Sequence, residues 1–169
     1  NTVNFDSGAQ IRDGIKSLHK QGVCSENELP YDIEQFTQQP SEKCYEDALN
    51  HKIIKYHRVE QDIEHLKSCL ASGNPIVFGF SVYESFESDE IAETGIMKMP
   101  QLNEKVLGGH AVMAVGYSDE KKVIIVRNSW GVDWGDNGYF YMPYAFITDK
   151  NMCSDFWSII STLALYFLE

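Results

Sequence analysis

The sequence predicts an α+β protein in which helices come first and antiparallel strands follow. Apolar residues at the helical spacing fall within the first 72 residues, and short apolar runs bounded by turn-forming residues fill most of the remainder. Of the 169 residues, 43% are hydrophobic and 12% aromatic, which suffices for an ordinary packed core. Neither an internal repeat nor a low-complexity tract interrupts this order.

The first helix is predicted from Ser7 to Gly22. Ser7 and Gln10 have the spacing of a capping box, and Gly22 is a natural helix stop. Three apolar residues, four and then three apart, form one face of this helix: Ile11, Ile15 and Leu18. Residues 23–50 are polar and contain two prolines, so they predict a long ordered loop with one helical turn near Tyr45–Leu49.

A second helix is predicted over residues 60–72, with Ile63, Leu66 and Leu70 facing inward and Gly73 as its stop. Residues 84–106 predict a polar connector without regular structure. Six segments predict strands: 53–59, 75–83, 110–117, 123–128, 138–142 and 155–160. The last four follow one another closely, which is typical of an antiparallel sheet.

The charge balance excludes some partners. Fourteen basic and 25 acidic residues give a net charge of −11, which repels nucleic acid and offers no basic patch to an anionic membrane. No apolar run approaches the roughly 20 residues that a membrane-spanning helix needs. We therefore expect neither a nucleic-acid nor a membrane partner.

The cysteines and histidines do not predict a metal site. Cys24, Cys44, Cys69 and Cys153 are scattered without metal-ligand spacing. His65 and Cys69 are four apart on the second predicted helix, but no second pair accompanies them. We expect no metal and no other cofactor.

The chemistry is concentrated in two segments eighteen residues apart. The first reads His110-Ala-Val-Met-Ala-Val-Gly-Tyr117, and the second runs from Arg127-Asn128-Ser-Trp130-Gly to Trp134-Gly and Gly138-Tyr139. A thiol nucleophile needs a base, and the base must be oriented. If the two strands pair, His110 and Asn128 can meet at one end of the sheet, with the amide side chain fixing one ring nitrogen.

This compound pattern resembles the papain family of cysteine proteases, and the likeness covers residues 5 to about 160. The resemblance implies a papain-like two-lobe fold, with the back half of a helical lobe in residues 1–50 and a β-rich lobe in 51–169. It implies a cysteine peptidase that acts through an acyl-enzyme. His110 would be the general base and then the general acid, and Asn128 would orient it. Trp130 and Trp134 would shield their hydrogen bond from water.

The resemblance also implies substrate-binding positions. Phe5-Asp6-Ser7-Gly8 is similar to the family's substrate-binding turn, in which the backbone of the residue at the Gly8 position pairs with the substrate chain. Ser7 departs from the family's glycine. Carried over position by position, the peptide site and its main specificity pocket comprise Gly8, Ala9, Gln10, Gly79, Gly109, Ala111, Trp130 and Ser158. Such a pocket would be open and would take an apolar side chain from a peptide or protein substrate.

The nucleophile has no counterpart in this sequence. In papain-like proteases the histidine follows the cysteine by about 130–150 residues, which places the cysteine roughly 20–40 residues before Asn1. Half of the oxyanion hole should lie there too. Of the cysteines present, Cys44 and Cys153 resemble family disulfide cysteines: the partner of Cys44 would precede Asn1, and residues 101–107 hold none for Cys153. Cys24 follows the first helix, and Cys69 is expected in the core.

Three origins of this pattern remain open: one piece of a two-chain or cleaved enzyme, a truncated piece of a longer chain, or a homologue that lacks the nucleophile. The first two predict that a second chain or an N-terminal segment carries the cysteine and that this polypeptide alone is inactive. The third predicts a non-catalytic peptide-binding or inhibitory module. Another Cys–His–Asn enzyme, an amidase or acyltransferase, is a further alternative. The resemblance implies a soluble protein of the lysosome, the vacuole or the extracellular space.

Overall fold

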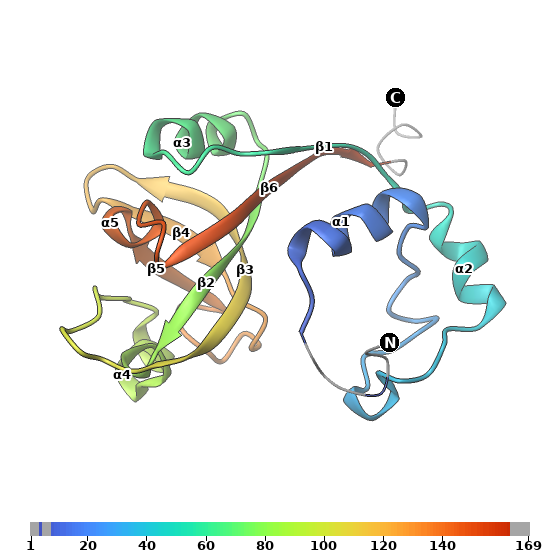
Figure 1. The fold of residues 1–169 in the computed structure, drawn as a ribbon, viewed down its shortest axis with the longest axis horizontal. Helices are drawn as coiled ribbons and strands as arrows, with labels where there is room; N and C mark the ends of the chain where they lie inside the picture. Colours follow the sequence, from blue (N-terminus) through green and yellow to red (C-terminus); the bar gives the residue numbers. More distant parts are fainter. Residues whose placement is uncertain (1–3, 5–7, 163–169) are drawn as a thin grey trace. The chain divides into compact units, whose positions relative to one another are not determined.

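The computed structural model describes residue 4 and residues 8–162, and it confirms the α+β class (Figure 1). The chain divides into two compact units. The first comprises residues 1–56 together with 159–169, and the second comprises residues 57–158. The lobes assigned from the sequence, 1–50 and 51–169, stay a prediction about the parent fold.

The first unit opens with the helix α1 (Ile11–Lys20), whose inward residue is Ile15. The predicted capping box is wrong. Gln10 is the N-cap residue, and its side chain makes no capping hydrogen bond. Gly8 has a φ of +69°, a left-handed conformation that a right-handed helix does not contain, so the helix begins only after it. Ser7 lies outside the described residues.

The segment predicted as a loop contains two short helices, η1 (Ile33–Gln35) and α2 (Glu42–Ala48). The predicted helical turn is the second half of α2, which begins earlier because Ser41 caps it. The Ser41 hydroxyl accepts a hydrogen bond from the backbone N–H of Cys44. Cys44 and Ala48 are the buried residues of this helix.

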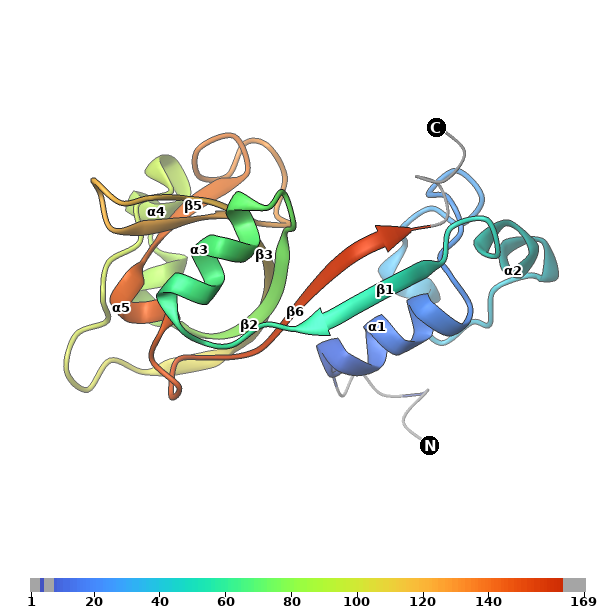
Figure 2. The same ribbon diagram turned by 90° about the horizontal axis from the view of Figure 1, so that it is seen from above.

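The strands form one six-stranded sheet with the order β1-β6-β2-β3-β4-β5. Their bounds are β1 (Ile53–Arg58), β2 (Ile76–Tyr83), β3 (Val106–Ser118), β4 (Val123–Arg127), β5 (Tyr139–Pro143) and β6 (Cys153–Thr162). Figure 2 shows β1 and β6 side by side. All six predicted strands are present.

The strand β3 begins four residues earlier than predicted. Val106–Gly109 pairs with the end of β2, where Gly108 lies opposite Val82 and Gly109 opposite Ser81. Glycine does not favour a strand, so the adjacent Gly108 and Gly109 did not predict one. The extension of β3 is recognised only from its pairing with β2. As a result His110 lies within β3 instead of at its start.

The helix α3 (Ile63–Ala71) contacts β3 and β2 in the second unit. It begins three residues later than predicted because Asp62 is its N-cap. Leu66 is fully buried and Leu70 nearly so, as the apolar spacing predicts. Four inward residues of β2 meet them in the core, alternating along the strand: Ile76, Phe78, Phe80 and Val82.

Like η1, three further short helices were not predicted: η2 (Glu84–Glu87), α4 (Asp89–Thr94) and α5 (Tyr144–Ile147). The first two occupy the segment assigned as a structureless connector. Most residues of these two helices are polar, and only Phe86 and Ile91 point inward and are buried. Two apolar residues are too few to predict a helix from the sequence. Gly95 ends α4 with a φ of +68°, and a side chain there would clash with the backbone carbonyl of Tyr139.

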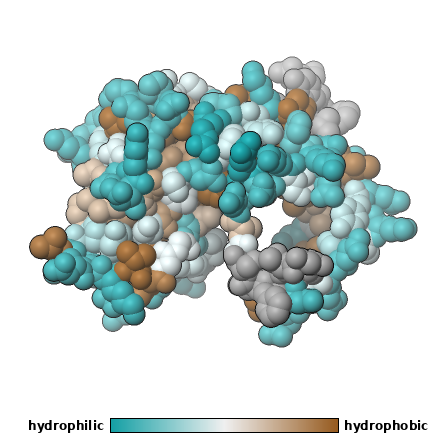
Figure 3. All heavy atoms as spheres, viewed as in Figure 1, coloured by the Kyte–Doolittle hydropathy of each residue, from teal (hydrophilic) through white to brown (hydrophobic). Residues whose placement is uncertain are grey.

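The surface agrees with the acidic composition. The face in Figure 3 is mostly hydrophilic, and its hydrophobic side chains form small separate groups. Within residues 8–162, no helix has the length and apolar character to cross a membrane.

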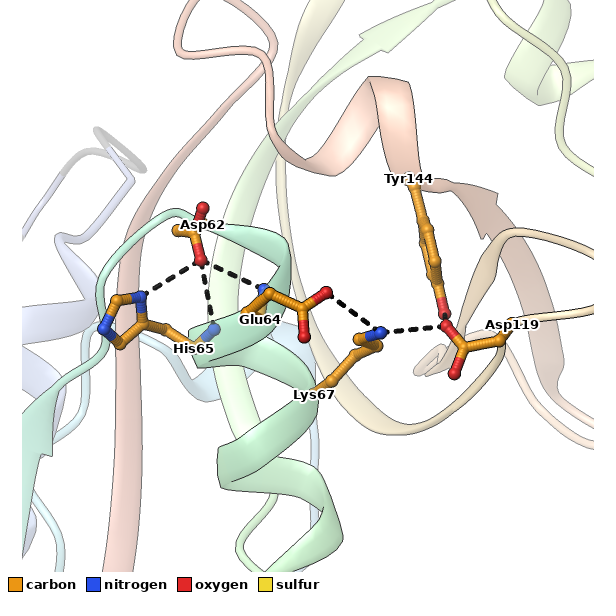
Figure 4. Close-up of polar contacts among 6 residues, drawn as sticks. All are labelled: Asp62, Glu64, His65, Lys67, Asp119 and Tyr144. Atoms are coloured by element: carbon orange, nitrogen blue, oxygen red, sulfur yellow. Dashed lines mark hydrogen bonds and ion pairs between the residues drawn. The ribbon is translucent and has the colours of Figure 1, made fainter.

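The N-cap of α3 leads to a prediction about acid stability. An oxygen of Asp62 accepts hydrogen bonds from the backbone N–H groups of Glu64 and His65 and lies 3.1 Å from Nδ1 of His65 (Figure 4). These bonds, the His65 N–H foremost, lower the pKa of the Asp62 carboxyl. The stability they contribute is therefore complete above the usual carboxyl pKa and is lost as the pH falls through the lowered value.

We expect Asp62→Ala to lower the thermal midpoint near pH 7 and to lower it less at a pH below the lowered pKa of the Asp62 carboxyl, where the wild-type cap is protonated. Thermal unfolding followed by circular dichroism across this pH range is the measurement. Glu120→Ala removes an exposed carboxylate from a turn and is the matched control, for which we expect an unchanged midpoint. An equal loss at both pH values for Asp62→Ala would contradict the pKa argument.

Candidate active site

His110 and Asn128 are brought together by the pairing of β3 with β4. His110 lies within β3, and Asn128 is the first residue after β4, held in line by a bond from its backbone N–H to the carbonyl of Gly138. Nε2 of His110 lies 2.8 Å from Oδ1 of Asn128. The structure thus has the hydrogen-bonded pair that the two sequence segments suggest.

The local bonds of Asn128 fix the direction of this contact. Its Oδ1 also accepts a bond of 2.8 Å from the backbone N–H of Ser129, so this atom is the oxygen. Nε2 of His110 must then be the protonated nitrogen that donates, which leaves Nδ1 as the unprotonated one in the neutral ring. Within residues 8–162, Nδ1 makes no hydrogen bond.

The pair is protected from water on the Asn128 side. Asn128 is 8% exposed and its Nδ2 is buried without a partner in the described part of the chain, whereas His110 is half-buried. Burial strengthens a hydrogen bond by excluding competing water. The unpartnered amide group is a cost that a structural asparagine would ordinarily avoid.

Aromatic rings surround His110. Trp130 stacks on the imidazole with ring centroids 5.1 Å apart, and Trp134 meets Trp130 edge to face at 5.1 Å. Phe80 of β2 lies directly across from His110 in the sheet and contacts its ring at 5.8 Å. We did not identify Phe80 from the sequence, although its inward place in the alternation of β2 was a usable signal.

Three of the proposed pocket positions of the second unit lie in the paired parts of β2 and β3 on either side of Phe80 and His110, and the fourth, Ser158, lies in β6 opposite Ile76. Gly79 of β2 lies directly opposite Ala111 of β3, so the two share one face of the sheet. Gly109 is opposite Ser81, with open space where a side chain would lie. Ser158 is fully buried, and its hydroxyl donates to the Pro75 carbonyl at 2.8 Å.

The remaining predicted positions, Gly8, Ala9 and Gln10, precede α1 in the first unit. All three are exposed. Gly8 has room for a side chain but the left-handed backbone that favours glycine. Their part in substrate binding stays a prediction.

The cysteines of the second unit are placed for packing. Cys153 is 2% exposed, and burial, with a smaller contribution from the charge of Asp149, raises the pKa of its thiol far above the usual range. Cys69 packs against the core from α3, as expected, and its thiol donates to the Asn74 carbonyl at 3.6 Å. A deeply buried thiol with a raised pKa is a poor nucleophile.

On α3, Nδ1 of His65 contacts the N-cap Asp62 (Figure 4). Across residue 4 and residues 8–162, no group of three or more metal-ligating side chains comes together. Between His65 and Cys69 on α3, Lys67 forms surface ion pairs with Glu64 and Asp119. Asp119 also accepts a hydrogen bond from the Tyr144 hydroxyl. Burial and the neighbouring Asp119 raise the pKa of Tyr144 to about 12.

Comparison with known proteins identifies similar sequences over nearly the whole chain. Residues 6–158 match the family described as papain family cysteine protease. A peptidase C1-like protein of Acanthamoeba polyphaga mimivirus is 49% identical over 94% of this chain and 54% of its own length. Mouse pro-cathepsin H is 31% identical over 80% of this chain and 39% of its own length. The chain thus spans about half, or less, of these relatives.

Among solved structures, xylellain, a cysteine protease from Xylella fastidiosa, is 48% identical and superimposes with a TM-score of 0.87. It covers 94% of this chain, which covers 64% of xylellain. The two agree in the papain-like fold.

Proposed function

Because the chain belongs to the papain family of cysteine proteases, we propose that it supplies the His–Asn half of a cysteine-peptidase active site. The observation that supports this most directly is the 2.8 Å bond between His110 and Asn128 inside the matching sequence pattern. The parent protein is then a peptidase whose substrates are peptides or proteins. Its nucleophilic cysteine lies in an N-terminal segment or in a second chain.

The geometry assigns the proton transfers to one atom. Nδ1 of His110 accepts the proton of the cysteine thiol while Asn128 holds Nε2, and the thiolate attacks the substrate carbonyl carbon. Nδ1 then gives the proton to the departing amine, which leaves an acyl-enzyme. A water molecule, deprotonated at Nδ1, attacks the acyl carbon and releases the acid and the thiol. Trp130 and Trp134 keep water from the His110–Asn128 bond during both steps.

We expect the polypeptide 1–169 alone to be inactive, since it would contain the base without the thiolate. Hydrolysis of a fluorogenic peptide should be measured for this polypeptide and for the complete parent protein, with an epoxide inhibitor labelling the nucleophile. Turnover by the parent, with the label on a cysteine outside residues 1–169, supports the proposal. Saturable peptide binding without turnover would select a binding or inhibitory module, and ammonia release or acyl transfer would select an amidase or acyltransferase.

The specificity pocket offers a separate prediction. Ala111 is exposed on the sheet face that it shares with Gly79. We expect Ala111→Phe in the active parent to fill this space and to lower kcat/KM about ten- to a hundredfold for peptides with a large apolar side chain at the pocket. Peptides with a small side chain there should be cleaved nearly as before. Val115→Ala, four residues along the same strand, is the control, and a uniform loss for both peptide types would argue against a pocket at Ala111.

A further inference from the structure

The segment that follows α1 runs along α2 within the first unit. Three backbone positions hold it there: a Cβ on Gly22 would lie 1.8 Å from the Ala48 carbonyl oxygen, the N–H of Val23 donates to the His51 carbonyl at 3.3 Å, and the N–H of Ser25 donates to Oδ2 of Asp47 at 2.9 Å. Cys24 lies between the last two of these contacts. Its place against α2 is therefore fixed from both sides.

Cys44 approaches the same segment from α2. It is 5% exposed, and its Sγ lies 3.3 Å from the Ser41 hydroxyl and donates to the carbonyl of Glu28 at 3.8 Å. The neighbouring Lys43 forms an ion pair of 2.5 Å with Glu28. The two ends of the segment from residue 24 to residue 28 are thus both bound to this helix.

Cys44 is part of the surroundings that shift the pKa of the Cys24 thiol. Partial burial raises the pKa of the Cys24 thiol, and the next two causes are the charge of Cys44 and a hydrogen bond with it. Cys69 and Cys153, in the second unit, have other neighbours: Asn74 for the first, and Asp149 for the second. Among the four cysteines, Cys24 and Cys44 are the pair that the fold carries on adjoining segments of one unit.

We propose that Cys24 and Cys44 form a reversible disulfide that fastens the segment after α1 to α2. This assignment differs from the one implied by resemblance to the family, which gives Cys44 a partner before Asn1. It is independent of peptidase activity. Both cysteines are free in this structure.

The oxidant we assign is a low-molecular-weight disulfide such as oxidised glutathione. Cys24 is the more exposed thiol, so its thiolate attacks one sulfur and releases the first glutathione thiolate. The thiolate of Cys44 then attacks Cys24 in this mixed disulfide and releases the second. The protein loses two hydrogens, the two protons pass to the released thiolates through water, and one glutathione disulfide is reduced to two thiols.

The test is disulfide mapping in the complete parent protein. After equilibration with oxidised glutathione, free thiols are blocked with iodoacetamide and the peptides are analysed by mass spectrometry without reduction. We expect a linked pair of peptides containing Cys24 and Cys44, and its loss on treatment with reduced glutathione. Cys69 and Cys153 should carry the alkyl group in both samples. Neither Cys24→Ser nor Cys44→Ser should give a linked pair: Cys44 should be alkylated in the first variant, and Cys24 should carry glutathione in the second, because no thiol resolves the mixed disulfide.

A measurement of thermal stability distinguishes a disulfide that stabilises the fold from a disulfide that forms without any effect on it. Closing the segment from 24 to 44 should raise the thermal midpoint of the oxidised parent over the reduced one by about 5–10 °C. The double variant Cys24→Ser/Cys44→Ser should show no redox dependence, and Cys69→Ser should behave as the wild type. The proposal is overturned if both thiols are alkylated after oxidation, or if Cys44 is linked to a cysteine other than Cys24.

Discussion

Replacing His110 with alanine is expected to lower kcat/KM of the parent peptidase by about 10³- to 10⁴-fold. His110 is proposed as the only carrier of the proton in both halves of the reaction, and its Nε2 is already engaged by Asn128. No neighbouring side chain replaces it, because the rings that surround it, Trp130 and Phe80, carry no base. The measurement is steady-state hydrolysis of a fluorogenic peptide by the purified parent.

His57→Ala is the matched control, since His57 is an exposed histidine at the end of β1. We expect it to leave kcat/KM within about twofold of the wild type, as for an ordinary surface change. Asn128→Ala should give a loss smaller than that of His110→Ala, because the base survives without its orientation. Full activity in His110→Ala, with the fold intact by circular dichroism, would refute the proposed role.

The largest effect on stability is expected from Phe140→Ala. Phe140 of β5 is fully buried and contacts the rings of Phe86, Trp134 and Phe80 at centroid distances of 5.1, 5.8 and 5.9 Å. Truncation leaves a cavity among rigid rings that cannot collapse into it, so we expect the free energy of unfolding to fall by about 3–5 kcal/mol. Urea unfolding of the parent, followed by tryptophan fluorescence, measures the loss.

Leu102→Ala is the control for this experiment. Leu102 is 92% exposed, so its truncation should change the free energy of unfolding by less than about 0.5 kcal/mol. A loss below about 1 kcal/mol for Phe140→Ala would mean that the cluster repacks. Because Phe140 and Trp134 support the ring that stacks on His110, a fall in activity is also expected from the same variant.

The strands were predictable because their inward residues alternate or run continuously between turn formers. In β2, Ile76, Phe78, Phe80 and Val82 alternate with less buried neighbours, and that period identifies both the strand and its inward face. The helices α4 and α5 were not predicted, because they lack such a period. Each is too short for a helical period to develop: α4 depends on capping by Ser88 and on the burial of Ile91, and α5 depends on the burial of Phe146.

The sequence by itself determined the α+β class and the position of the strands. It also determined the proposed base His110, the Asn128 that would orient it, and the family whose pattern contains both residues. These depend on residue type and local spacing, which a sequence displays directly. Only the tertiary structure decided that Nε2 of His110 contacts Asn128, that Phe80 lies across from the imidazole, and that the segment carrying Cys24 lies along α2. Each of these arrangements joins segments that are far apart in the chain. Strand register and helix packing fix them, and the local spacing of residues in a sequence does not reveal either one.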